Sequence, residues 1–108
     1  MVNGVCILTE REARARGHDV LVARIPASAV PRAKTLGATR GLYKAVTERG
    51  SGRILGAAIL AVHGGEVIAV IQTAMLAGLP APALRDAVLA HPTMAEGLNT
   101  LFASWIDS

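Results

Sequence analysis

Residues 41–62 leave this chain few folds to choose from, because two apolar runs flank a short glycine-rich stretch. The runs are Gly41–Thr47 and Arg53–Val62, and the stretch between them, Glu48–Gly52, contains two glycines. Strand-forming runs joined by three to five residues that include glycine are typical of a β-hairpin. The second run has almost no polar alternation, so we expect it at the centre of a sheet, covered on both faces.

Capping boxes, prolines and glycines mark the remaining elements. The expected elements, beside the hairpin, are a short strand at Val5–Leu8, a helix from Thr9 to Gly17, a strand at Asp19–Ile25 ended by Pro26, a connection with at most one short turn at Ala27–Thr39, and helices at Glu66–Ala77 (with Gly78 at C′), Pro82–Leu89 and Met94–Trp105. This order predicts an α+β fold, an antiparallel β-sheet with helices packed on one face. At 108 residues, 1–108 form a single domain.

The composition leaves two interpretations of the apolar surface open. Hydrophobic residues make up 52% of the chain, which is more than a small core readily absorbs. The excess predicts an apolar face for a partner, or it reflects an alanine-rich composition that needs none. The segment 66–77 is apolar around most of its circumference, so one side could cover the sheet and the other could meet a second subunit. Glu66 and Gln72 would lie on this helix, in an interface, solvated or capping role.

Charge and cysteine content argue against several classes of function. The net charge is +3, but aromatic residues make up only 3% of the chain and provide no platform for stacked bases, so no nucleic-acid partner is expected. Cys6, the single cysteine, lies in an apolar run and is expected to be a buried, unreactive thiol. We find no metal-ligand spacing and no uninterrupted apolar segment long enough for a membrane span, and we expect a cytoplasmic protein with no membrane contact.

The segment His91-Pro92-Thr93-Met94-Ala95-Glu96 combines an imidazole, a restricted peptide bond and a carboxylate. Thr93 and Glu96 have the spacing of a capping box, which predicts a helix start at Thr93. Imidazole is the side chain most often used for acid/base chemistry near neutral pH, and His91 has Glu96 as an orienting partner close by. On spacing alone, two interpretations remain: a helix N-terminus with an incidental histidine, or an acid/base site.

These patterns together resemble the C-terminal interface domain of the pyridine nucleotide-disulfide oxidoreductases, which include glutathione reductase, dihydrolipoamide dehydrogenase and mercuric reductase. The matching segments run along nearly the whole chain, and residues 35–98 look most like the mercuric-reductase branch, which includes enzymes of reactive-chlorine defence. The segments are Gly4 with Leu8-Thr9-Glu10 and Ala13, Gly41-Leu42-Tyr43-Lys44, Arg53-Ile54-Leu55-Gly56-Ala57, Gly65-Glu66-Val67-Ile68, Ala77-Gly78-Leu79 and the His91–Glu96 motif.

The resemblance implies specific roles. The domain would form much of a homodimer interface, and His91 would reach the redox disulfide above the flavin of the other subunit as general acid/base. Glu96 would hydrogen-bond His91, Pro92 and Thr93 would lie near the partner's flavin, and the His91–Pro92 bond would be cis. Glu96 could serve the helix cap, the histidine or both.

The resemblance also implies that the activity belongs to a larger protein. The chain has no Gly-x-Gly-x-x-Gly fingerprint and no paired cysteines. We therefore expect no cofactor in the isolated domain, and FAD and NAD(P)H in a parent enzyme whose FAD- and NAD-binding domains are its further partners. The alternatives are a free-standing interaction or regulatory module without a redox role, or a small hydrolase based on His91 and Glu96, for which no nucleophile is identifiable.

Overall fold

The computed structural model describes residues 8–106 and contains an antiparallel sheet with short helices around it. Its elements are α1 (Glu10–Ala15), β1 (Val20–Pro26), the 3₁₀ turn η1 (Ala27–Ala29), α2 (Pro31–Thr35), β2 (Leu42–Glu48), β3 (Ile54–Leu60), α3 (Gly64–Leu76), α4 (Ala81–Asp86), the 3₁₀ turn η2 (Met94–Glu96), α5 (Gly97–Leu101) and β4 (Trp105–Ile106).

The sheet has the order β3-β2-β1-β4, and every pair in it is antiparallel. The predicted hairpin is confirmed: β2 pairs with β3 from Leu42–Leu60 to Thr47–Ile54, with one irregularity beside Thr47. β1 lies on the other side of β2, with Ala23 opposite Ala45. The α+β class predicted from the sequence is therefore confirmed.

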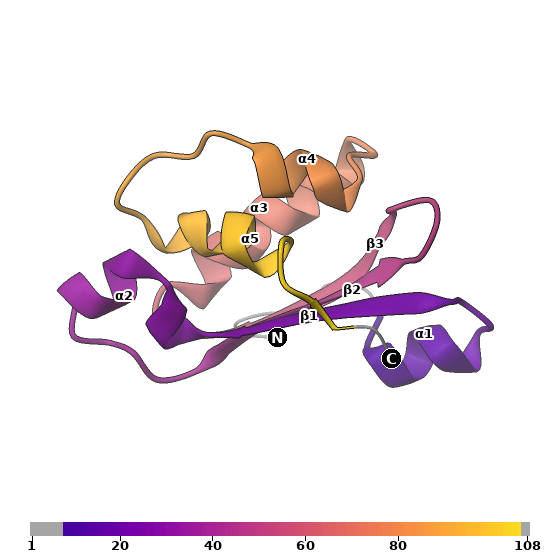
Figure 1. Ribbon diagram of the computed structural model, residues 1–108, viewed down its shortest axis with the longest axis horizontal. Helices are drawn as coiled ribbons and strands as arrows, with labels where there is room; N and C mark the ends of the chain where they lie inside the picture. Colours follow the sequence, from indigo (N-terminus) through magenta and orange to yellow (C-terminus); the bar gives the residue numbers. More distant parts are fainter. Residues whose placement is uncertain (1–7, 107–108) are drawn as a thin grey trace.

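The sheet separates two apolar clusters (Figure 1). The larger one lies under α3, α4 and α5 and contains Tyr43, Ile59, Ile71 and Phe102, all fully buried. The smaller one lies under α1, on the opposite face, and is made by Leu8, Ala13, Val20, Val22, Val46 and Leu55. Most helices thus lie on one face as expected, and α1 covers part of the other.

The third predicted strand is buried as expected but is not central in the described sheet. β3 is the end strand of the order, with α3 packed against it. Leu8 lies beside it and donates its backbone N–H to the Leu55 carbonyl at 3.1 Å. Gly56 faces the Leu8 backbone so closely that a Cβ atom would collide with it. The strand predicted at Val5–Leu8 and the thiol of Cys6 otherwise lie outside the described residues.

Three predicted boundaries are corrected by the structure. The connection 27–39 contains η1 and α2 rather than at most one turn, since Pro31 supplies a helical φ at the start of α2. The helix from Pro82 ends at Asp86, because Ala87 is extended. The last helix ends at Leu101, where the Ser104 hydroxyl donates a hydrogen bond to the Leu101 carbonyl at 2.8 Å. Trp105 then belongs to β4, in which it pairs with Ala23 of β1.

Candidate functional site

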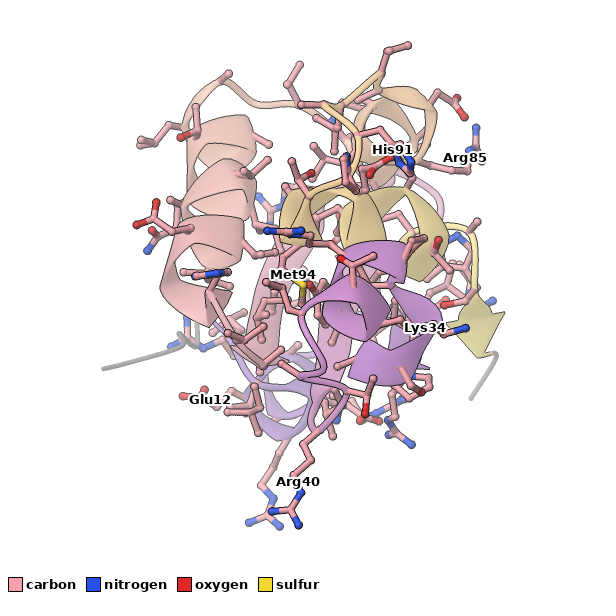
Figure 2. All side chains as sticks on the ribbon, turned by 90° about the vertical axis from the view of Figure 1, so that its left-hand side faces the viewer. Glu12, Lys34, Arg40, Arg85, His91 and Met94 are labelled. Atoms are coloured by element: carbon pink, nitrogen blue, oxygen red, sulfur yellow. The ribbon has the colours of Figure 1, made fainter. Side chains whose placement is uncertain are left out.

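The His91–Glu96 motif lies where the chain passes from α4 to α5 at one end of the molecule (Figures 1 and 2). The His91–Pro92 peptide bond is cis, as the resemblance implied. Thr93 is extended and caps η2, which continues directly into α5. The motif therefore consists of a non-helical segment, His91 to Thr93, followed by the helical turn η2.

The Glu96 carboxylate serves both the cap and the histidine. Its Oε1 atom lies 2.8 Å from His91 Nδ1 and also accepts the Thr93 backbone N–H at 3.1 Å. In return, Thr93 Oγ1 accepts the Glu96 backbone N–H at 3.3 Å, which completes the capping box. A single oxygen atom of Glu96 thus makes the bond to the helix cap and the bond to His91, which spacing alone could not decide.

This arrangement fixes the chemistry of the imidazole ring. A carboxylate oxygen that already accepts a backbone N–H is an acceptor toward His91 as well, so Nδ1 carries the ring proton. In the neutral ring the lone pair is then on Nε2. The His91 side chain is 68% exposed whereas that of Glu96 is 21% exposed, so the pair is anchored through Glu96 and the imidazole lies at the surface.

Tyr43 joins the motif to the sheet. Its hydroxyl donates to the Met94 carbonyl at 2.7 Å, and its ring is fully buried. Burial raises the pKa of Tyr43 to about 12. Gly97 follows Glu96 and lies against this ring, where an added Cβ would be 2.5 Å from Tyr43 Cε2. The sequence placed Tyr43 in the strand-forming run Gly41–Thr47 and gave Gly97 no role. Nothing in the pattern around Tyr43 indicates its bond to Met94, 51 residues away.

A cavity of about 350 Å³ adjoins the motif. Thr93 and Met94 line one side, and Arg32 of α2 and the residues that begin α3, His63 and Glu66, line the others. His63 has a left-handed backbone conformation (φ 58°) at the N-cap of α3. The cavity therefore has charged side chains of both signs, Arg32 and Glu66, close to the His91–Glu96 motif.

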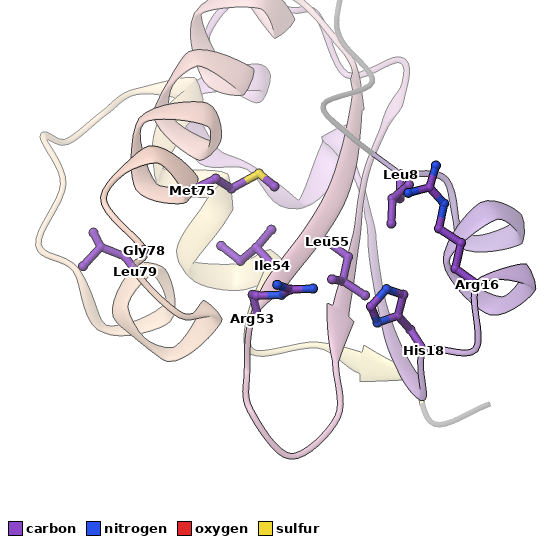
Figure 3. A pocket seen from close by; sticks show the side chains of 9 residues that line it. All are labelled: Leu8, Arg16, His18, Arg53, Ile54, Leu55, Met75, Gly78 and Leu79. Carbon is purple, nitrogen blue, oxygen red and sulfur yellow. The ribbon is translucent and has the colours of Figure 1, made fainter.

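A second cavity, of about 410 Å³, lies beside the β2–β3 turn (Figure 3). The side chains of Arg16, His18 and Arg53 line it above an apolar floor that includes Leu55. His18 Nδ1 lies 2.8 Å from Glu48 Oε2. None of its lining residues belongs to the His91–Glu96 motif.

The other residues singled out from the sequence have separate places. Glu66 and Gln72 are exposed on α3, Lys44 donates to Glu10 Oε1 at 3.0 Å, and Trp105 packs its ring 5.8 Å from that of Phe102. Within residues 8–106, no group of three His, Cys, Asp or Glu side chains is placed to hold a metal ion. No helix of that part of the chain is long and apolar enough to cross a membrane.

Comparison with known proteins decides the family. Residues 4–102 match the family described as the pyridine nucleotide-disulphide oxidoreductase dimerisation domain. The chain belongs to this family. This dimerisation domain is 43% identical over 96 residues to a probable pyridine nucleotide-disulfide oxidoreductase of Escherichia coli, RclA, and 38% identical over 92 residues to a mercuric reductase of Staphylococcus aureus.

The dimerisation domain covers only part of these relatives. The aligned residues are 89% of this chain but 22% of RclA, and 85% of this chain but 17% of the mercuric reductase. The solved structure of RclA, described as an HOCl-induced flavoprotein disulfide reductase, superposes on 92% of the chain with a TM-score of 0.88 at 41% identity. LpdA from Mycobacterium tuberculosis shares the fold, with a TM-score of 0.82 at 17% identity over 92% of the chain.

Proposed function

We propose that this dimerisation domain is part of a flavin-dependent disulfide reductase and supplies His91 and Glu96 as an acid/base pair to the active site of a second subunit. The observation that carries the proposal is the single Glu96 oxygen that holds both His91 and the helix cap. It gives an exposed imidazole a fixed tautomer and a fixed orientation. A capping box alone would not require the bond to His91.

The proposed chemistry is proton transfer. A cysteine thiol becomes a nucleophile only after it loses its proton. His91 Nε2 would accept that proton, and the Glu96 carboxylate would stabilise the imidazolium through Nδ1–H. When the thiolate has attacked a substrate disulfide, the imidazolium would return the proton to the leaving sulfur, so that one disulfide forms, one breaks and the histidine is neutral again.

FAD and NAD(P)H are assigned to other domains of the same enzyme in this proposal. The chain contains no Gly-x-Gly-x-x-Gly turn to hold a pyrophosphate, so its residues do not fit a complete nucleotide site. Pro92 and Thr93, at the edge of the 350 Å³ cavity, would lie near the flavin of the second subunit. The bound flavin would supply the electrons, and the residues of this domain would move the proton.

The same proposal assigns the outer face of α3 to the homodimer interface. An open apolar groove of about 500 Å³ follows this helix and is lined by Ala69, Val70, Ala74, Ala77, Leu79 and Leu84, with Glu66 and Thr73 at its edges. Leu76 and Leu79 are 90% and 44% exposed. Exposed apolar patches of this kind mark protein–protein interfaces.

The experiment uses the full-length reductase that carries this domain, with His91→Gln and Glu96→Gln compared in steady-state disulfide reduction. General acid/base catalysis is worth roughly 10²–10⁴-fold, so His91→Gln is expected to lower kcat by about that factor. Glu96→Gln retains an oxygen for the cap and is expected to lower kcat about tenfold or more through loss of the charge beside the imidazole.

The matched control is Glu12→Gln, because Thr9 and Glu12 form a second capping box with the same bonds and no histidine. This variant is expected to reduce disulfides at the wild-type rate. Unchanged activity in His91→Gln would refute the proposal, whereas equal losses in Glu96→Gln and Glu12→Gln would reduce the role of Glu96 to the cap.

A further inference from the structure

We propose that Asn99 is a positioning residue that holds the segment carrying His91 in place. Asn99 lies on α5 and points back to the end of α4, 12–15 residues earlier in the chain. The catalytic part of this inference rests on the proposed function. The structural part, that Asn99 determines the orientation of His91, stands independently of it.

The Asn99 side-chain amide gathers three backbone carbonyls. Nδ2 donates to the Leu84 carbonyl at 2.8 Å and to the Ala87 carbonyl at 2.9 Å, and the Arg85 carbonyl lies at 3.3 Å. The reversed amide would place Oδ1 against three oxygens, so the geometry requires the NH₂ group here. The last carbonyls of a helix have no partner within the helix, and Asn99 supplies one for α4.

Residues 87–93 have few other attachments. Val88 is fully exposed and the His91 side chain is 68% exposed, so neither is packed into the core. The segment is held at its start by the bond from Asn99 to the Ala87 carbonyl. At its end, Thr93 Oγ1 donates to the Ala90 carbonyl at 2.7 Å and Glu96 binds His91.

Both attachments lead to one rigid unit. Glu96 and Asn99 are three residues apart, on the continuous stretch formed by η2 and α5. Water could replace the bond at the exposed Arg85 carbonyl, but it could not fix the distance from α4 to α5. The structural consequence of Asn99 is therefore restraint: it reduces the conformations of the segment before His91 reaches its partner.

Two near-isosteric variants test this inference in the 108-residue chain. Asn99→Leu keeps the volume but has no donor, and Asn99→Asp places a carboxylate oxygen against the carbonyls. NMR measures the hydrogen exchange of the Thr93 amide, which bonds Glu96 Oε1, and the fraction of the His91 ring that carries its proton on Nδ1. We expect exchange at Thr93 to be about fivefold faster in both variants, with a smaller Nδ1–H fraction, because a local opening that costs slightly less free energy is populated several times more.

Ile71→Val is the control, since Ile71 is buried in α3 and its apolar side chain cannot form a hydrogen bond to residues 87–93. It destabilises the fold generally and is expected to leave the Thr93 exchange rate and the His91 tautomer unchanged when compared at equal distance from its melting temperature. Wild-type values in both Asn99 variants, or equal changes in Ile71→Val, would overturn the inference.

The reductase assay separates this inference from the proposed function. In the full-length enzyme, Asn99→Leu is expected to lower kcat with little change in KM, by less than His91→Gln does. Faster Thr93 amide exchange and a smaller Nδ1–H fraction of His91, together with an unchanged kcat, would refute the catalytic part alone. If His91→Gln proved fully active, the proposed function would fail and the NMR result would still decide whether Asn99 positions His91.

Discussion

The carboxylate of Glu96 shows how much one atom can determine. Oε1 receives the Thr93 amide and lies 2.8 Å from His91 Nδ1, so the same oxygen starts a helix and fixes an imidazole tautomer. Sequence spacing identified His91 and Glu96 but could not decide whether the Glu96 carboxylate caps the helix or binds His91, because both roles need an acidic residue at this position. The structure shows that Glu96 Oε1 makes both hydrogen bonds.

Tyr43 is the least local part of the site. It lies on β2 and donates a hydrogen bond to Met94, 51 residues away, so the sequence of the His91–Glu96 motif could not predict its contribution. Thr47, also on β2, contrasts with it: the Thr47 hydroxyl is buried with no hydrogen-bond partner among the described residues. Both residues are buried, so the difference between them is the acceptor: the Met94 carbonyl lies within reach of the Tyr43 hydroxyl.

The titration of Tyr43 tests this anchor. Burial raises the pKa of Tyr43 to about 12 from the ordinary 10.0 of a phenol, and Tyr43 is the single tyrosine of the chain. Between these values the unfolded chain loses the phenolic proton while the folded chain keeps it, so stability is expected to fall as pH rises from about 10 to 12. At about pH 11, tyrosinate absorbance should be small in the folded protein and near its full value in urea. A folded-state midpoint close to 10 would show that the phenol is not buried as described.

At the scale of elements, the junction of α5 with β2 is the tightest contact near the site. Gly97, the first residue of α5, faces Tyr43 and Val30, and an added Cβ would lie 2.5 and 2.8 Å from their side chains. Glu96 directly precedes Gly97, so the absence of a side chain at Gly97 lets the helix bring the carboxylate close to the sheet. A steric requirement of this kind fixes the position of the element.

A pair of glycine substitutions measures that requirement. Gly97→Ala is expected to lower the free energy of unfolding by about 1–3 kcal/mol, because the core must shift to admit a methyl group. Gly65, in the first turn of α3, has nothing within 4 Å of an added Cβ, and Gly65→Ala is expected to raise the free energy of unfolding by about 0.5–1 kcal/mol. Urea denaturation of the two variants should give opposite signs. Equal destabilisation would contradict the described packing.

The elements predicted correctly are those with strong local signals. The hairpin, the capping box at Thr9 and the glycine that ends α3 each follow from a few neighbouring residues. The errors arose where distant contacts decide: α4 stops where its carbonyls meet Asn99, and the chain leaves α5 to pair Trp105 with β1. Within residues 8–106, β3 ends the strand order although its sequence predicted a central place, because an apolar strand reports burial and not strand order.

For the whole molecule, the apolar excess of the composition has a defined place. The larger core cluster lies under α3, and the groove along this helix opens directly over cluster members Ala74 and Leu84, with Leu76 exposed beside it. The alternative of an alanine-rich composition with no partner would scatter such residues over the surface. Leu36, Leu60 and Val88 are indeed exposed singly elsewhere, whereas Leu76 and Leu79 lie together with the groove along α3, a region that combines an apolar hollow with exposed leucines.

Leu76→Asp tests the interface. A charge at this 90% exposed position should not affect folding, but it should weaken a homodimer that buries α3. Light scattering of the full-length enzyme over a dilution series is expected to show dissociation at higher concentration than for the wild type. Ala15→Asp, on exposed α1 across the sheet, is the control and should leave the dimer intact. A Leu76→Asp dimer as stable as the wild type would place the interface elsewhere.

The most direct measurement of the account is complementation between subunits of the full-length reductase. One subunit carries His91→Gln with its redox cysteines intact, and the other carries wild-type His91 with its redox cysteines replaced by serine. The His91→Gln homodimer should keep about a hundredth of the wild-type rate or less and the cysteine-free homodimer should be inactive. The mixed dimer should have one working site, because His91 of the second subunit serves the cysteines of the first. Disulfide reduction at about half the wild-type rate per dimer is the expected result. An inactive mixed dimer would show that His91 does not act across the interface.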